Sequence, residues 1–162
     1  MAFPAMRRAH QQLSKTQCTE ILKNGSNGVL AVHGDDGFPY TVPLSFVLHD
    51  GNIYFHCATA GHKLRGIERS SKVSFCVVAR DDVLSEKFTT VFSSVVVFGE
   101  VQQVTYGDEL MGAMQALADK YCPHEPPHAF AREMAGSAGR LCVVRIRPLH
   151  ITGKQAKELL QY

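Results

Sequence analysis

Six stretches rich in β-branched and aromatic residues recur along this chain at the spacing of antiparallel hairpins. They occupy residues 28–33, 40–48, 53–56, 73–79, 88–105 and 141–151. The Asp-Gly pair at 50–51 is a hairpin turn signal, because it supplies positive backbone φ at low cost. The pattern predicts a mainly β fold with a few helices, a six-stranded antiparallel barrel, with a β-sandwich as the alternative. It argues against a doubly wound nucleotide fold, which needs alternating strands and helices.

Individual residues refine this prediction. Pro43 removes a backbone donor from the second stretch, which places that strand at an edge or a bulge. Gly99 marks a bulge in the stretch 88–105, which is long enough for one bent strand or two. Ser14 and Gln17 form a capping box that begins a helix. Further helices are expected at 62–69, 108–121 and 127–135.

Composition limits the classes of protein. A chain of 162 residues with 45% apolar and 20% charged residues has the make-up of one globular domain, predicted over 1–162. A net charge of +2 without basic runs argues against nucleic acid as a partner. No apolar stretch approaches the roughly 20 residues of a membrane span. Five scattered cysteines without a CxxC pair, and an opening unlike a signal peptide, favour a cytoplasmic location.

The segment IYFHCATAGHKLRGI at 53–67 reads as a strand that turns into a helix. In the strand, alternate residues share a face, so one face suits the core and the other a groove or a partner. The two sets are Ile53, Phe55 and Cys57, and Tyr54, His56 and Ala58.

The helix that follows begins near Gly61, with His62 and Lys63 in its first turn. A helix N-terminus attracts anions, while a lysine there is unfavourable for the helix alone, so this junction suits a phosphate. An ordinary turn with a solvated lysine is the alternative, because the chain contains neither a GxxxxGK nor a GxGxxG motif. Residues 122–128 carry Cys and His but not zinc spacing, so no metal is predicted.

In their order, several short motifs resemble the nitroimidazole-reductase-like branch of the pyridoxamine 5′-phosphate oxidase-like superfamily. They are PYTVPLSF at 39–46, YFHCA at 54–58, GHKL at 61–64, SVVVFG at 94–99 and ITGK at 151–154. The resemblance covers nearly the whole chain. It implies an FMN-binding split barrel that forms a homodimer with the cofactor at its interface.

The resemblance also implies roles for particular residues. The strand residues Val42, Pro43, Leu44 and Ser45 would offer backbone groups to the isoalloxazine ring. His56, Cys57 and Ala58 would lie along the flavin, His62 and Lys63 would hold its phosphate, and Ser94 would make a polar contact. Relatives often have serine where this chain has Cys57, and a thiol donates only weakly.

The implied activity is an FMN-dependent oxidoreductase that reduces a small acceptor, such as a nitroimidazole, by two electrons from a small-molecule donor. His56 would be the catalytic residue, because an imidazole can deliver protons near neutral pH, with an ordinary interface histidine as the alternative. A non-catalytic flavin or haem binder of the same fold is the second hypothesis. A deazaflavin cofactor ranks below FMN.

Overall fold

The computed structural model describes residues 3–137 and 139–160, and the other positions of the predicted domain 1–162 lie outside the described residues. The helices are α1 (Lys15–Asn24), α2 (His62–Arg69), α3 (Gly107–Tyr121) and α4 (Pro127–Gly136). The strands are β1 (Gly28–His33), β2 (Pro39–Leu44), β3 (Val47–His49), β4 (Asn52–Ala58), β5 (Lys72–Leu84), β6 (Thr89–Val104) and β7 (Leu141–Gln155). Single turns of 3₁₀ helix are η1 (Ala9–Gln11), η2 (Asp35–Gly37), η3 (Ser85–Lys87) and η4 (Lys157–Leu159).

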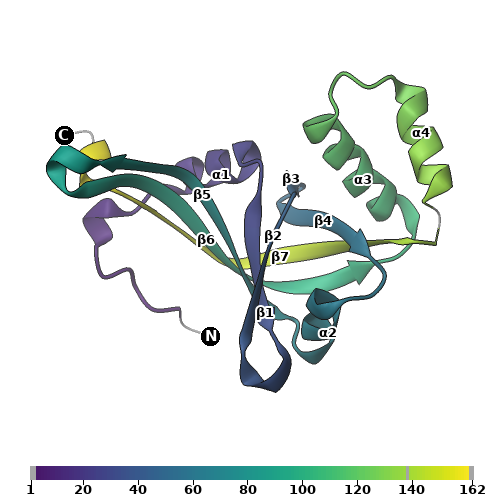
Figure 1. The fold of residues 1–162 in the computed structure, drawn as a ribbon, viewed down its shortest axis with the longest axis horizontal. Coiled ribbons are helices and arrows are strands. Elements are labelled where there is room, and N and C mark those ends of the chain that lie inside the picture. The colour runs from purple at the N-terminus through teal and green to yellow at the C-terminus, as the bar shows by residue number, and fades with distance from the viewer. Residues whose placement is uncertain (1–2, 138, 161–162) are drawn as a thin grey trace.

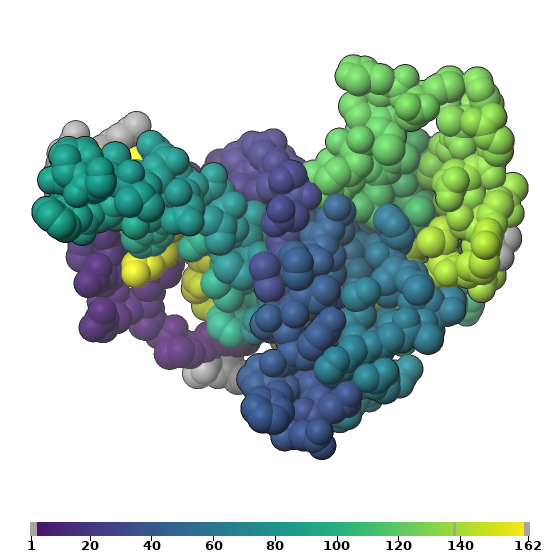
Figure 2. Space-filling view, in the orientation of Figure 1, coloured from purple at the N-terminus to yellow at the C-terminus, as the bar shows by residue number. Residues whose placement is uncertain are grey.

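All seven strands form one sheet in the order β2-β1-β5-β6-β7-β4-β3, and every pairing is antiparallel. The two edge strands, β2 and β3, are consecutive in the sequence and are joined by Ser45 and Phe46 alone. Because this short link brings the two edges together, the sheet curls on itself and remains split between β2 and β3. The long β5–β6 hairpin extends away from α2, α3 and α4 (Figure 1), and Figure 2 shows it as a lobe on the opposite side of the molecule from α3 and α4.

The mainly β antiparallel prediction is confirmed, but the count of six strands is wrong because residues 40–48 form two strands. The break falls at Phe46, whose side chain is wholly buried. The Phe46 N–H donates to the hydroxyl oxygen of Tyr121 at 2.9 Å, and Lys120 Nζ donates to the Phe46 carbonyl at 2.8 Å. Two side chains from the end of α3 therefore satisfy the backbone groups that a continuous strand would have paired.

Several local predictions are confirmed. Ser14 and Gln17 form the capping box of α1. Asp50 and Gly51 both have positive φ in the turn between β3 and β4. The register between β6 and β7 shifts at Gly99, where a Cβ atom would lie 2.7 Å from the Arg147 carbonyl oxygen. Each of these features follows from local sequence chemistry, which explains why it was visible before the fold was known.

Two apolar clusters hold the layers together. The main core lies inside the curled sheet, where Phe46, Phe55 and Phe75 are wholly buried, and α1 and α2 contribute residues such as Leu22 and Leu64. A second cluster joins α3 to the other side of β3, β4 and β7, around Tyr54, Met114 and Val143. No helix in the described part of the chain is long and apolar enough to cross a membrane.

Candidate functional site

The junction between β4 and α2 follows the predicted division of faces on the core side. Ile53, Phe55 and Cys57 are buried in the main core. On the other face, His56 and Ala58 are exposed, but Tyr54 is buried against α3, and its hydroxyl donates to Glu109 Oε1 at 3.0 Å. The part of this outer face that is open to a ligand is therefore the end of β4 nearest to α2.

The N-terminus of α2 has the properties of an anion site. Gly61 precedes it with φ of 141°, and a Cβ atom at that position would meet nothing within 4 Å. The described residues provide neither a capping side chain nor an acidic group in the first turn. The first backbone N–H groups of a helix have no intrahelical acceptor, so an N-terminus without a capping side chain suits a phosphate. The residues at this junction fit a phosphate-bearing cofactor.

Lys63 supplies a cation beside these amide groups. It is half-buried and forms no ion pair with the residues that the structure describes. Its charge acts on Cys57 and Cys142, which lie directly opposite each other on β4 and β7. Burial raises the pKa of Cys57 despite Lys63, and burial, with Cys57 next in importance, raises the pKa of Cys142 to about 11. Both thiols therefore stay protonated near neutral pH, and they offer weak donors rather than nucleophiles.

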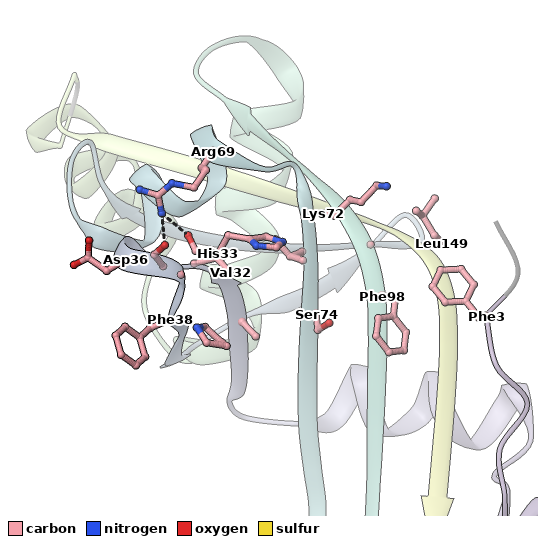
Figure 3. A pocket seen from close by; sticks show the side chains of 16 residues that line it. Phe3, Val32, His33, Asp36, Phe38, Arg69, Lys72, Ser74, Phe98 and Leu149 are labelled. Carbon is pink, nitrogen blue, oxygen red and sulfur yellow. Dashed lines mark hydrogen bonds between the residues drawn. The ribbon is translucent and has the colours of Figure 1, made fainter.

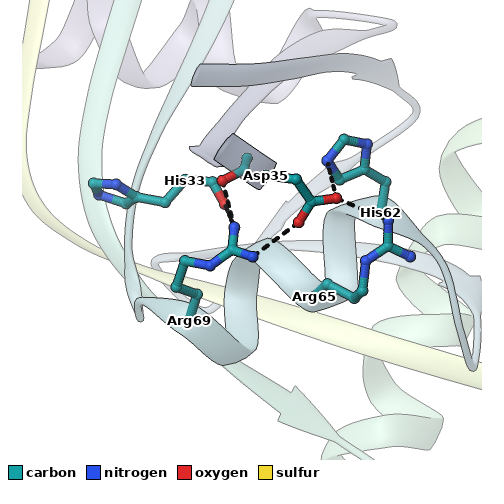
Figure 4. A network of polar contacts seen from close by, with 6 residues as sticks. His33, Asp35, His62, Arg65 and Arg69 are labelled. Atoms are coloured by element: carbon teal, nitrogen blue, oxygen red, sulfur yellow. Dashed lines mark hydrogen bonds and ion pairs between the residues drawn. The ribbon is translucent and has the colours of Figure 1, made fainter. Parts of the chain in front are cut away.

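His62 is engaged with the hairpin between β1 and β2 (Figure 4). Its ring stacks on Tyr40 at 4.1 Å between centroids, and its buried Nε2 lies 3.2 Å from Asp35 Oδ2. Arg65 and Arg69 donate to the same carboxylate at 3.1 and 2.8 Å. Hydrogen bonds from Arg69 and then Arg65 lower the pKa of Asp35 to about 2. The His62 side chain therefore has a neighbouring anion within its own chain.

The predicted flavin strand, β2, is an edge of the sheet and pairs with β1 alone among the described strands. Val42 and Leu44 are half-buried against the core, while Pro43 and Ser45 are exposed. An edge strand presents unpaired backbone groups along its free side. Only the backbone groups of 42–45 that point away from β1 are therefore left without a strand partner.

Ser94 lies elsewhere in the chain. It pairs with Val78 on β5 and Lys154 on β7, in the part of the sheet that leads into the β5–β6 hairpin. Figure 1 shows this hairpin extending away from α2. The structure therefore brings together Cys57, His62 and Lys63 near the α2 N-terminus, and links them to β2 through Tyr40, but it does not bring Ser94 to them within one chain.

A cavity of about 640 Å³ lies on the outer face of β1, β5 and β6 (Figure 3). Its wall includes three aromatic rings, from Phe3, Phe38 and Phe98, and the cationic groups of Arg69 and Lys72. None of the predicted cofactor residues lines it. Volume alone does not identify the cofactor site, and the uncapped helix with its lysine is the better match for a phosphate.

Sequence reasoning missed Tyr40 and the cluster around Asp35. One signal was present: residues 62, 65 and 69 are spaced by three and four, so their basic side chains share one face of a helix. A row of basic side chains on one helix face indicates that an acidic residue packs against it. The Asp-Asp pair of the preceding turn was the candidate, but the pairing depends on the crossing of α2 over β1, which no local pattern specifies.

Known proteins share this fold. A conserved hypothetical protein of Mycobacterium tuberculosis is 18% identical, with a TM-score of 0.80 over 98% of this chain and 95% of that chain. A candidate 5-nitroimidazole antibiotic resistance protein of Bacteroides thetaiotaomicron is 16% identical, with a TM-score of 0.74 over 89% and 86%. A protein of Mycobacterium smegmatis that binds FAD and haem is 18% identical, with a TM-score of 0.71 over 91% and 74%. No curated protein matches the sequence.

The sequence itself matches a family model. That model, described as pyridoxamine 5′-phosphate oxidase, covers residues 14–155, from the cap of α1 to the end of β7. The span includes every strand of the sheet and the whole β4–α2 junction. The chain therefore belongs to the pyridoxamine 5′-phosphate oxidase family, within the split-barrel superfamily of that name.

Proposed function

We propose that this protein is an FMN-dependent oxidoreductase that transfers two electrons to a small acceptor such as a nitroimidazole or another nitro-aromatic compound. The observation that carries the proposal is the β4–α2 junction. It combines an uncapped helix N-terminus, open space at Gly61 and Lys63, which forms no ion pair with any residue that the structure describes. Lys63 and the α2 amide groups would hold the phosphate. The free edge of β2, with Val42–Ser45, would face the ring system.

A bound flavin supplies the two-electron chemistry, and the protein provides position and protons. His56 is exposed at the end of β4 and would donate a proton to the reduced acceptor. Cys57, with its neutral thiol, would be a weak donor near the ribityl chain and phosphate. His62 would steady the junction through its stacking on Tyr40 and its contact with Asp35, which leaves Lys63 as the side chain that holds the phosphate.

We further propose a homodimer with the cofactor at its interface. One face of the sheet carries exposed apolar side chains, including Val29, Val78 and Phe98. Pro43 pairs with Val29, and Ser94 pairs with Val78, so both predicted cofactor residues share this face. A second copy on this face would cover the apolar residues and bring its own Ser94 to a flavin held by the first.

The free cysteines fit a cytoplasmic protein.

The direct test is the absorption spectrum of the purified protein, recorded before and after incubation with FMN and desalting. Retained flavin bands at about one FMN per subunit, followed by reduction of a nitroimidazole with a nicotinamide donor, would support the proposal. A folded protein that retains no FMN would contradict it.

The second candidate is a non-catalytic flavin or haem binder. It is favoured by the exposure of His56, which forms no hydrogen bond with the described residues, and an imidazole of this kind is a common haem ligand. A sharp Soret band after incubation with haemin, lost in His56→Ala, would support haem. Flavin binding without turnover of any nitro-aromatic acceptor would support a carrier.

A further inference from the structure

The cationic stripe of α2 already has an anion. His62, Arg65 and Arg69 lie on one face of the helix, and the carboxylate of Asp35 contacts all three at 3.2, 3.1 and 2.8 Å (Figure 4). Arg69 also donates to the carbonyl oxygens of His33 and Gly34, so it is tied to the backbone as well. These basic side chains therefore already have an anionic partner within the chain.

The helix is fixed at this distance from Asp35 by its packing. Gly66 faces β1, and a Cβ atom there would lie 2.5 Å from Val32 Cγ2 and 2.9 Å from the His33 carbonyl oxygen. Leu64 and Ile67 are buried in the main core on the adjoining side of the helix. Close packing therefore sets the position of α2, and the ion pairs with Asp35 determine which of its cations remain available.

Lys63 is the one basic residue of α2 that forms no ion pair with the described residues. It lies about 100° around the helix from His62, toward Cys57 and Cys142. A monophosphate concentrates its charge on one group, which a helix N-terminus and one lysine can hold. A diphosphate has a second charged group. The Arg65 guanidinium, on the same face of α2 as His62, already donates to Asp35, and His62 Nε2 lies 3.2 Å from that carboxylate.

We infer that Asp35 is a specificity-determining residue that matches this site to a flavin mononucleotide rather than a flavin dinucleotide, by occupying the basic side chains that a second phosphate would need. The inference rests on the proposed flavin site. Asp35 acts through His62 and Arg65, and it is a positioning residue rather than a contact of the cofactor.

The test compares the dissociation constants of FMN, FAD and riboflavin in the full-length protein by fluorescence titration. The wild type is expected to bind FMN at least about tenfold more tightly than FAD, which is the effect of one charge-assisted contact. Asp35→Asn is expected to lower the dissociation constant of FAD by about tenfold, while the dissociation constants of FMN and riboflavin change by less than about threefold. Adding Arg65→Gln to Asp35→Asn is expected to remove the gain.

Asp36→Asn is the matched control. Asp36 is the next residue along the chain, and it forms no ion pair with the described residues, so its substitution removes the same charge without releasing Arg65. An equal gain for FAD in Asp36→Asn would overturn the inference, because it would assign the effect to net charge. Unchanged FAD-to-FMN selectivity in Asp35→Asn, or a wild type that prefers FAD, would also overturn it.

Arg65→Gln alone provides a test that does not depend on the folding of the Asp35 variant. Arg65 is 56% exposed, so the fold is expected to tolerate its loss. If Asp35 holds Arg65, FMN affinity in Arg65→Gln stays within about threefold of the wild type. A tenfold loss of FMN affinity would mean that Arg65 contacts the cofactor. That result would overturn the inference about Asp35 but not the proposed function. Failure of the wild type to bind any flavin would overturn the proposed function together with it.

Discussion

Lys120 and Phe46 are joined by two contacts, although 74 positions separate them in the chain. The ammonium group donates to the Phe46 carbonyl oxygen at 2.8 Å and lies 4.2 Å from the centroid of its ring. The same ammonium group donates to the Gly25 carbonyl at 2.7 Å. Lys120 therefore ties the end of α3 to the loop after α1 and to the break between β2 and β3.

Replacing Lys120 with methionine should destabilise the protein by about 1–3 kcal/mol, because the part-buried carbonyl groups of Gly25 and Phe46 each lose the ammonium donor. Methionine keeps most of the side-chain length, so the packing loss is small. The measurement is the free energy of unfolding in urea. Lys23→Met, which removes an exposed lysine paired with Glu20, is the control and should cost less than about 0.5 kcal/mol. Equal effects of the two substitutions would remove the bridging role of Lys120.

The ion pairs of Asp35 should make stability depend on acid pH. The pKa of Asp35 is lowered from 3.8 to about 2 by the hydrogen bonds from Arg69 and Arg65. A carboxyl group with a lowered folded-state pKa stabilises the fold above its unfolded pKa and loses that contribution as pH falls through the folded one. Melting temperatures of the wild type should therefore fall from pH 4 to pH 2 more steeply than those of Asp35→Asn. In Asp36→Asn the slope should match the wild type, and a flattened slope there would contradict the assignment.

From the exposed apolar face of the sheet we predict a dimer, which a single charged substitution on that face should dissociate. Val78 is 61% exposed on β5 and is paired with Ser94, so Val78→Lys should leave the monomer folded while a buried lysine weakens the dimer by at least tenfold. Light scattering across a concentration series measures the change. Met111→Lys on α3, where Met111 is 45% exposed, is the control. A wild type that is monomeric at high concentration would refute the dimer.

The parts of the fold that were predictable from sequence are those that local chemistry determines. The capping box at Ser14, the turn at Asp50-Gly51 and the bulge at Gly99 each depend on a few neighbouring residues. The break at Phe46 was not predictable, because its cause lies in Lys120 and Tyr121 at the far end of another helix. The core face of β4 followed from alternation, whereas the burial of Tyr54 required the position of α3.

The candidate site divides in the same way. The prediction of an anion site at residues 61–63 needed only local sequence, since it depends on a glycine, a helix start and a lysine in succession. The engagement of His62 with Asp35 was not visible, because 27 positions separate them and close packing at Gly66 brings them together.

His56→Gln should retain FMN but slow the reduction of a nitro-aromatic acceptor. General acid catalysis contributes about 10²–10⁴-fold, so a loss of at least about tenfold in the rate of flavin reoxidation is expected. Stopped-flow absorbance of the prereduced protein mixed with acceptor measures that rate, and FMN titration checks the binding. His124→Gln, at an exposed loop position, is the control. Equal reoxidation rates for His56→Gln and the wild type would exclude His56 as the proton donor.

The choice between the β4–α2 junction and the 640 Å³ cavity as the flavin site can be made with two lysines. Lys63 stands at the N-terminus of α2, and Lys72 lines the cavity. If the junction holds the phosphate, Lys63→Ala should weaken FMN by about 1–3 kcal/mol and leave riboflavin unchanged, because riboflavin has no phosphate. Lys72→Ala should change the affinity for neither FMN nor riboflavin. The reverse pattern, with FMN sensitive to Lys72 alone, would move the cofactor to the outer face of the sheet. A loss of both flavins in Lys63→Ala would mean that the substitution disturbs the fold of the junction rather than a phosphate contact.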